Sequence, residues 1–250
     1  MGMNGAQEDA HAGGHSTVHG TPGGLAVSAA GYTLQVSPKT FEAGQEEAFG
    51  LRILDRGGHA ARDFDEQHGE RMHLMVVRRD LIHYQHLHPS LGTDGTWSVP
   101  LVLPEPGVYR AFADFSVGGE SLTLGADLHV PGEMRLTSLP DPTSVARVDG
   151  YEVELDTSNP TAGVEIQLTF RIDQEGQDVQ ELEPYLGALG HLVALREGDL
   201  AFLHVHPTGG AGARIMFHAV FPSMGLYGLF LQFAHEGRVR TVDFITEILP

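Results

Sequence analysis

The sequence predicts an all-β protein made of two tandem β-sandwich domains that arose by internal duplication. First, His73 with His86-Leu87-His88 and His191 with His204-Val205-His206 share one internal spacing of 13 residues. Second, Gly107-Val108-Tyr109 precedes Gly225-Leu226-Tyr227 by 118 positions, which is also the offset from His73 to His191. Third, the apolar runs are short and are bounded by turn residues, as is typical of sandwiches and barrels.

Six strands are expected in the first repeat, with counterparts in the same order in the second. They are Tyr32 to Val36, Phe49 to Leu54, His73 to Val77, Leu81 to Leu87, Gly107 to Phe115 and Leu122 to Val130. Only Asp63 to Glu70 and Val179 to Leu189 leave room for a helical turn. Each domain is therefore expected to be an Ig-like or cupredoxin-like β-sandwich.

The chain divides into four segments. Residues 1–24 are rich in Gly, Ala and His without apolar periodicity, which predicts a flexible tail. Residues 25–131 and 149–250 are the expected sandwich domains, each with a histidine site, and each has an ordinary domain size. The Pro-containing stretch 132–148 is the expected linker.

Charge and composition exclude several classes of function. The 33 acidic and 15 basic residues give a formal net charge of −18, which repels nucleic acids and anionic membranes. No apolar run is long enough to insert into a membrane, and the N-terminus lacks the pattern of an export signal. The chain has no cysteine, which excludes disulfides, thiolate zinc sites and cysteine-ligated copper.

The spacing of the histidines predicts their convergence. Arg196-Glu197-Gly198-Asp199 resembles a two-residue hairpin turn, which would place His191 opposite His204. The same register in the first repeat puts Arg79-Asp80 at the tip and His73 opposite His86. Residues two apart on a strand share a face, so each repeat should gather three imidazoles on one face.

Three clustered imidazoles are a suitable ligand set for Cu(II) or Zn(II). We therefore expect His73, His86 and His88 to bind one ion and His191, His204 and His206 to bind a second. Copper is preferred and zinc is the second choice, because affinity for nitrogen-rich sites peaks at Cu(II). The alternative is that these histidines lie at strand ends and bind backbone carbonyls, but the repeated spacing favours metal.

Additional ligands are expected mainly in the first repeat. Asp114 lies between aromatic residues on a strand that otherwise belongs to the core, where an unpaired carboxylate is costly. Asp114 is therefore a candidate fourth ligand, and its counterpart Gln232 in the second repeat is a weaker one. His68, five residues before His73, is a further candidate ligand, but its counterpart in the second repeat is Leu186. Met72 and Met75 could bind Cu(I), although methionine beside a strand more often fills a core.

The stretches MHLMVVRRDLIHYQHLHP, GTWSVPLVLPEPGVYRAFADF and GHLVALREGDLAFLHVHP resemble a poorly characterised family of bacterial secreted or cell-envelope proteins, described as heavy-metal-binding or copper-associated. This resemblance covers about residues 31 to 250 and implies an extracytoplasmic location. Members of that family usually begin with an export signal. More distantly, the chain is similar to periplasmic copper-resistance carriers.

The leading hypothesis is a transition-metal binding protein, copper above all, that sequesters or delivers the ion outside the cytoplasm. No catalytic residue is assigned, and a carrier is preferred to an enzyme. The first alternative is a bicupin-like or dismutase-like metalloenzyme, but no glutamate follows His88 or His206 at the usual short distance. The second alternative is an envelope interaction module whose histidines are incidental.

Overall fold

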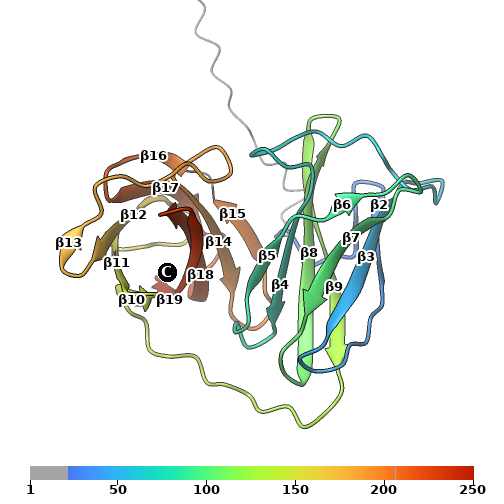
Figure 1. The fold of residues 1–250 in the computed structure, drawn as a ribbon, viewed down its shortest axis with the longest axis horizontal. Helices are drawn as coiled ribbons and strands as arrows, with labels where there is room; N and C mark the ends of the chain where they lie inside the picture. Colours follow the sequence, from blue (N-terminus) through green and yellow to red (C-terminus); the bar gives the residue numbers. More distant parts are fainter. Residues whose placement is uncertain (1–21, 206) are drawn as a thin grey trace, which may run out of the picture.

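The computed structural model describes residues 22–205 and 207–250, apart from the side chain of His204. Every strand pair in its four sheets is antiparallel, and no helix occurs among these residues. Two sandwich-shaped halves lie side by side, joined below by a long connection (Figure 1). The predicted all-β, duplicated sandwich is confirmed, and the two segments with room for a helical turn, Asp63 to Glu70 and Val179 to Leu189, contain no helix.

The first half consists of an outer and an inner sheet. The outer sheet has the strand order β1 (Ser28–Ala29), β2 (Tyr32–Ser37), β3 (Glu46–Leu54), β7 (Trp97–Val102), β6 (Ser90–Leu91). The inner sheet has the order β5 (Gln85–Leu87), β4 (His73–Arg78), β8 (Gly107–Val117), β9 (Glu120–Val130). Leu34, Leu51, Leu74 and Tyr109 belong to the apolar core between these sheets.

The second half repeats this arrangement. Its outer sheet has the order β10 (Val145–Val148), β11 (Tyr151–Thr157), β12 (Glu165–Gln174), β17 (Arg214–Val220), β16 (Pro207–Ala211), with β13 (Gln177–Asp178) paired to β12. Its inner sheet has the order β15 (Phe202–Val205), β14 (Gly190–Arg196), β18 (Gly225–His235), β19 (Arg238–Ile248). Val153, Phe170, Leu192 and Leu229 belong to the second core.

The burial of each strand shows how many faces are covered. β2 and β3 alternate buried and more exposed residues, as expected when one face meets the core and the other meets solvent. By contrast, β4 is buried at all six positions and β14 at its first six. A strand buried on both faces needs a second partner, and for β4 and β14 this partner is the inner sheet of the other half.

A third apolar cluster joins the two inner sheets. It comprises Met75, Val77, Leu81, Phe112, Val193, Leu195, Leu200, Phe202 and Phe230. The labels β4 and β5 lie next to β14 and β15 in Figure 1, in agreement with this contact. The repeats are therefore fixed face to face by apolar packing.

Two aromatic pairs across this boundary are related by exchange of the repeats. Tyr84 stacks on Phe230 with ring centroids 4.1 Å apart, and Phe202 packs on Phe112 at 5.4 Å. Tyr84 and Phe202 are equivalent positions at the offset of 118, as are Phe112 and Phe230. Such reciprocal contacts are the signature of an approximate two-fold axis, here within a single chain.

Each repeat also contains a tyrosine corner. The hydroxyl of Tyr109 donates to the carbonyl of Glu105, and that of Tyr227 donates to the carbonyl of Ser223, both at 3.0 Å. A tyrosine near the start of a strand that bonds back to the backbone a few residues upstream is a feature of Ig-like sandwiches. These two contacts support the Ig-like description of both halves.

The expected hairpin register is wrong by two residues. Met75 lies opposite His86, and Val193 lies opposite His204. The second hairpin loop is longer than a two-residue turn, because Asp199 accepts from Arg196 and from the backbone N–H of Ala201, while Leu200 takes a φ of 60°. A shift of two residues leaves each side chain on its original face, so the expected common face of His73 and His86 survives.

Both connecting segments contact the sheets. In the expected linker, β10 already pairs with β11, and the backbone N–H of Thr137 donates to Asp80. At the end of the expected tail, the carbonyl of Gly24 accepts two bonds from the guanidinium of Arg110. A Cβ at Gly125 would lie 2.0 Å from that carbonyl oxygen, so glycine is required at this close approach.

Candidate metal centre between the halves

Three histidines from both halves meet at the boundary between the inner sheets. His73 is the first residue of β4, His86 is in β5, and His191 is the second residue of β14. One ring nitrogen from each lies within 4.8 Å of the others, an arrangement that could hold a metal ion. His73 and His191 are 1% and 3% exposed, and His86 is half-buried.

The rings are packed against one another. Ring centroids are 5.2 Å apart for His73 and His86, 5.8 Å for His73 and His191, and 4.6 Å for His86 and His191. His73 and His191, which are equivalent in the two repeats, stack with an interplanar angle of 16°. The cluster therefore lies close to the approximate two-fold axis that relates the halves.

Hydrogen bonds outside the cluster determine which ring nitrogens carry protons. His73 Nε2 lies 3.1 Å from the carbonyl oxygen of Gln67, which can only accept, so Nε2 carries the hydrogen. His86 Nδ1 lies 2.6 Å from Gln232 Oε1, while Gln232 Nε2 donates to Thr241, so His86 Nδ1 also carries its hydrogen. In neutral rings, the acceptor lone pairs are then on His73 Nδ1 and His86 Nε2.

These two lone pairs face each other at 3.1 Å. Two acceptors at this distance repel unless a cation or a proton lies with them. Two nitrogen ligands of one tetrahedral zinc ion, each about 2.0–2.1 Å from the metal, are roughly 3.3 Å apart. Metal-binding histidines also typically donate their other N–H to a carbonyl or carboxylate, as both rings do here. This arrangement could therefore hold one metal ion between the two rings.

His88 lies beside this pair but is not part of the group of three. Its ring centroid is 5.1 Å from that of His73 and 4.7 Å from that of His86. Its Nε2 is buried without a hydrogen-bond partner among the described residues. Burial lowers the pKa of His88 because it disfavours the charged ring, and the negative charge of Glu70 partly opposes this shift. Burial therefore favours the neutral form of the His88 imidazole, which lies close to the site.

Asp114 and Gln232 occupy equivalent positions in the two repeats and form hydrogen bonds beside the cluster. Asp114 lies opposite His73 in the β4–β8 ladder, is 4% exposed and accepts from the hydroxyl of Thr123. Gln232 lies opposite His191 and bonds Thr241, which is the equivalent of Thr123. Asp114 is outside the group of three, and Gln232 acts on His86 of the other half.

His68 is on the rim of the cluster. Its ring centroid is 6.3 Å from His73 and 6.5 Å from His191, and the side chain is half-buried. The side chain of His204 and the whole of His206 lie outside the described residues. Met75 is buried in the cluster between the inner sheets, whereas Met72 is in the first-half core.

The histidines are thus grouped differently from the expected one set per repeat. His191 was expected in a separate second site, but it lies with His73 and His86. Local patterns did not identify Gln232 or the carbonyl of Gln67 as partners that orient the rings. A usable signal was present: the apolar runs that follow His73 and His191 have no polar alternation, which indicates strands covered on both faces.

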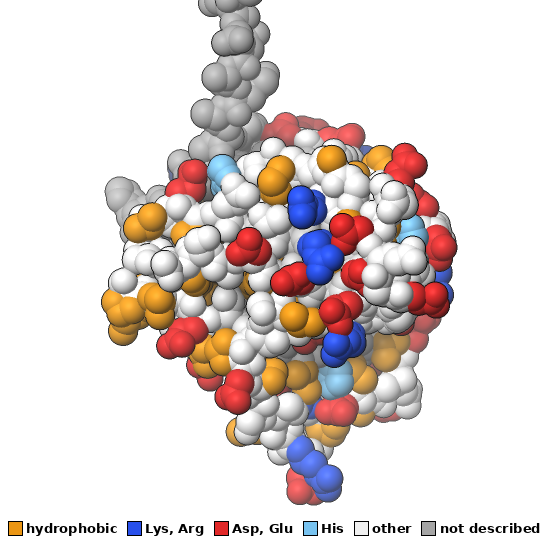
Figure 2. Space-filling view, turned by 90° about the vertical axis from the view of Figure 1, so that its left-hand side faces the viewer, with side chains coloured by type: hydrophobic (Ala, Val, Ile, Leu, Met, Phe, Trp, Pro, Cys, Tyr) orange, Lys and Arg blue, Asp and Glu red, His pale blue; other side chains and the backbone are white. Residues whose placement is uncertain are grey.

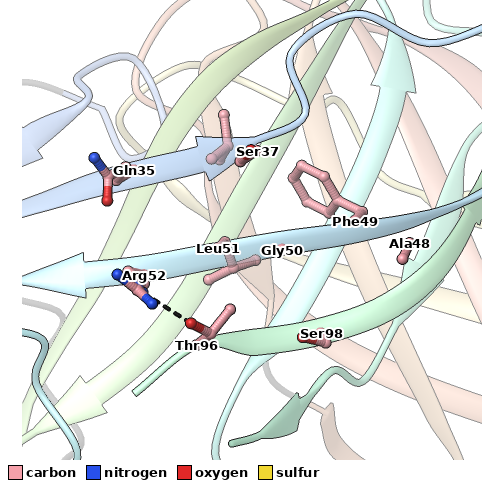
Figure 3. A pocket seen from close by; sticks show the side chains of 10 residues that line it. Gln35, Ser37, Ala48, Phe49, Gly50, Leu51, Arg52, Thr96 and Ser98 are labelled. Atoms are coloured by element: carbon pink, nitrogen blue, oxygen red, sulfur yellow. Dashed lines mark hydrogen bonds between the residues drawn. The ribbon is translucent and has the colours of Figure 1, made fainter. Parts of the chain in front are cut away.

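A surface hollow in the first half, shown in Figure 3, lies away from the histidine cluster. It measures about 630 Å³ and lies on the solvent side of the first outer sheet, where Arg52 donates to Thr96 at 2.8 Å (Figure 3). Apart from Arg52, its lining is made of neutral residues such as Ser37, Gly50 and Ser98. The whole first-half core separates it from the histidines.

The outer face of the second half carries mixed charge. Figure 2 shows acidic side chains spread over this face with basic ones among them. Arg147 pairs with Glu152, and Arg171 pairs with both Glu154 and Asp178. Neighbouring carboxylates thus neutralise Arg147 and Arg171 on this face. Among the described residues, no helix has the length and apolar character to cross a bilayer.

Comparisons with solved structures give distant similarity. The chain is similar to the Escherichia coli adhesin FdeC (13% identity, TM-score 0.31, covering 90% of this chain and 66% of that chain). It is similar to InvD of Yersinia pseudotuberculosis (11% identity, TM-score 0.31, 88% and 58%). It is also similar to Escherichia coli alpha-2-macroglobulin (13% identity, TM-score 0.30, 87% and 20%). The chain thus spans two thirds or less of the length of these proteins.

No curated protein matches the chain. Residues 27–132 and residues 146–249 each match one family model, described as a domain of unknown function, DUF8832. The two matches cover most of the chain and coincide with the two sandwich halves. The protein therefore belongs to the DUF8832 family and carries two copies of its domain.

Proposed function

We propose that the protein binds a transition-metal ion between its two halves, with copper preferred to zinc, and sequesters or delivers that ion outside the cytoplasm. The observation that carries this proposal is the 3.1 Å approach of His73 Nδ1 and His86 Nε2. Both rings use their other nitrogen as a donor, to Gln67 and to Gln232, so the facing nitrogens are left as acceptors. A third imidazole, His191, completes the group.

Copper is preferred on chemical grounds. Imidazole binds copper and zinc, and affinity along the divalent series peaks at Cu(II). The chain has no thiolate to favour other soft metals, and its absence of cysteine suits an oxidising compartment. The resemblance to bacterial cell-envelope metal proteins points to the same location.

A shared proton is the competing explanation for the facing nitrogens, because an imidazolium would also place a donor between them. The two explanations differ in what happens when metal is added. A metal site binds Cu(II) or Zn(II) tightly and releases protons as it fills. A purely structural imidazolium–imidazole pair leaves the stability and the proton content of the protein unchanged when either ion is added.

Calorimetric titration of the metal-free full chain with Cu(II) and with Zn(II) tests the proposal. We expect one ion per chain at the shared site, and we expect His86→Ala and His191→Ala to weaken binding to a similar extent, although they belong to different repeats. His218→Ala is the matched control, since His218 is on the outer sheet and pairs with Glu165. Wild-type affinity in both cluster variants would overturn the proposal.

The predicted contribution of the second repeat needs its own variants. His204→Ala and His206→Ala test two positions that lie outside the described side chains. The prediction of a separate second site requires two ions per chain, with the second ion lost in these variants. A stoichiometry of one that depends on His73, His86 and His191 together supports the shared site instead.

A further inference from the structure

A hollow opens at the edge of the histidine cluster where the two halves meet. It measures about 430 Å³ and is lined by His68 of the first half and by Gly187, Leu189, Pro207 and Gly209 of the second. Among the described residues of this lining, His68 is the one histidine. Leu189 directly precedes β14, so the hollow adjoins the strand that carries His191.

The backbone holds His68 in an unusual conformation. The backbones of Gln67 and Glu70 bond each other in both directions, at 2.7 and 3.0 Å. His68 and Gly69 have φ angles of 53° and 81°, which is the pattern of a type I′ turn. A left-handed conformation is uncommon for a residue other than glycine, although histidine adopts it more readily than most.

The second repeat contains the same turn with a different side chain. Tyr185 and Ala188 bond each other in both directions, and Leu186 and Gly187 have φ angles of 53° and 79°. The duplication therefore preserves the turn, but only the first copy carries an imidazole. Because Leu186 adopts this conformation, leucine at position 68 is compatible with the turn.

The turn also connects the hollow to the buried site. The carbonyl of Gln67 accepts from His73 Nε2, and His68 is the next residue. Its ring lies within 6.5 Å of the ring of His191 and slightly closer to that of His73. His68 thus lies between the hollow and two rings that have almost no exposed surface.

We infer that His68 is the entrance ligand of the site. A hydrated divalent ion such as Cu(II) in the hollow first binds His68 and then passes to His73, His86 and His191 by exchange of one ligand at a time. Stepwise exchange replaces each lost water with an imidazole, so the ion is never stripped of ligands. The nearby acidic residues Glu66 and Glu70, within a chain of net charge −18, raise the local concentration of cations. This inference rests on the proposed metal binding.

Stopped-flow mixing of the metal-free full chain with aqueous Cu(II), followed by the visible absorption of the copper complex, measures the exchange rates. His68→Leu copies the residue of the equivalent turn. We expect it to slow association and dissociation by a similar factor, about tenfold or more, while the equilibrium affinity changes by less than about threefold. His59→Leu is the control, because its imidazole is 84% exposed and lies outside the cluster.

A rescue variant separates an entrance ligand from a structural role. Aspartate tolerates a left-handed backbone and binds Cu(II), so His68→Asp should recover part of the association rate that His68→Leu loses. Unchanged rates in His68→Leu would overturn the inference, and so would a weakened affinity with an unchanged association rate, which identifies a static ligand. Absence of copper binding by the wild-type chain would instead overturn the proposed function itself.

Discussion

His86 of the first repeat donates from Nδ1 to Oε1 of Gln232 in the second repeat, at 2.6 Å. The bond crosses the boundary between the halves and leaves His86 Nε2 as an acceptor that faces His73. Gln232 therefore helps to determine which nitrogen of His86 can bind an ion. In the first repeat, the equivalent position is the acid Asp114, which is bonded by the equivalent threonine.

Replacement of Gln232 should tune the affinity for metal. A carboxylate that accepts from a ligating histidine makes that ring more basic, so Gln232→Glu should raise the affinity for Cu(II) by about tenfold, whereas Gln232→Ala should lower it by about tenfold or more. Competition with a chromophoric chelator measures both changes. Gln167→Glu adds the same charge at an exposed position on the second outer sheet and should have little effect. Equal affinities in all three variants would contradict a role for this residue.

Metal should stabilise the folded chain. At a free-ion concentration of 100 times the dissociation constant, binding to the native state alone adds about 2.7 kcal/mol to the free energy of unfolding. For a chain of this length, that corresponds to an increase in melting temperature of roughly 5–10 °C. Differential scanning calorimetry with and without Cu(II) measures the change. The increase should disappear in His191→Ala, and its persistence there would place the ion elsewhere.

The strands of the outer sheets could be predicted because each exposes one face. The alternation of Leu34 and Val36 with polar residues, for example, predicts β2 at its observed position. The hairpin loops could not be predicted to the residue, because Asp199 closes the second loop with its side chain and Leu200 adopts a positive φ. No local pattern in the sequence indicates the side-chain bond of Asp199 or the positive φ of Leu200.

The candidate site could be predicted only in part. The spacing of His73 and His86 indicated correctly that they share a face, because a register error of two residues preserves the parity of a strand. The position of His191 depends on how two folded halves dock. That docking is determined by Phe112, Phe202 and other residues far apart in the sequence, so neither repeat reveals it alone.

The aromatic contact next to the histidines should matter for metal binding. Phe230 is stacked on Tyr84 and lies opposite Val193, two residues from His191. Phe230→Ala should destabilise the chain by about 3–5 kcal/mol and also weaken Cu(II) binding to the folded protein, because it loosens the contact between the halves. Denaturant titration and chelator competition measure the two effects.

Phe170→Ala is the matched control for Phe230→Ala. Phe170 is fully buried in the second-half core, away from the boundary, and its loss should cost a similar amount of stability. The affinity of the folded protein for Cu(II) should stay near the wild-type value in this variant. Equal loss of affinity in both variants would show that general destabilisation, and not docking of the halves, controls the site.

The buried Arg78–Asp80 pair predicts a dependence of stability on pH. Burial alone would raise the pKa of Asp80, but the hydrogen bonds from Arg78 and from the backbone of Thr137 outweigh it and lower the pKa. A carboxyl with a lowered folded-state pKa stabilises the fold above its unfolded value of about 3.9. This stabilisation is lost as the pH falls through the folded-state pKa.

Asp80→Asn should therefore destabilise the protein at pH 7 by about 3 kcal/mol, since Arg78 keeps Glu105 as a second partner. The difference from wild type should narrow progressively below about pH 4, as the pH falls from the unfolded-state pKa through the lowered folded-state pKa and the wild-type carboxyl loses its charge. Urea unfolding at a series of pH values measures the difference in free energy of unfolding between the wild type and Asp80→Asn. Asp141→Asn is the control, because Asp141 is an exposed acid in the connection between β9 and β10. A constant difference between wild type and Asp80→Asn from pH 7 to pH 2 would contradict a stabilising role for the charge of Asp80. A loss of stability that comes only from altered packing would not depend on pH.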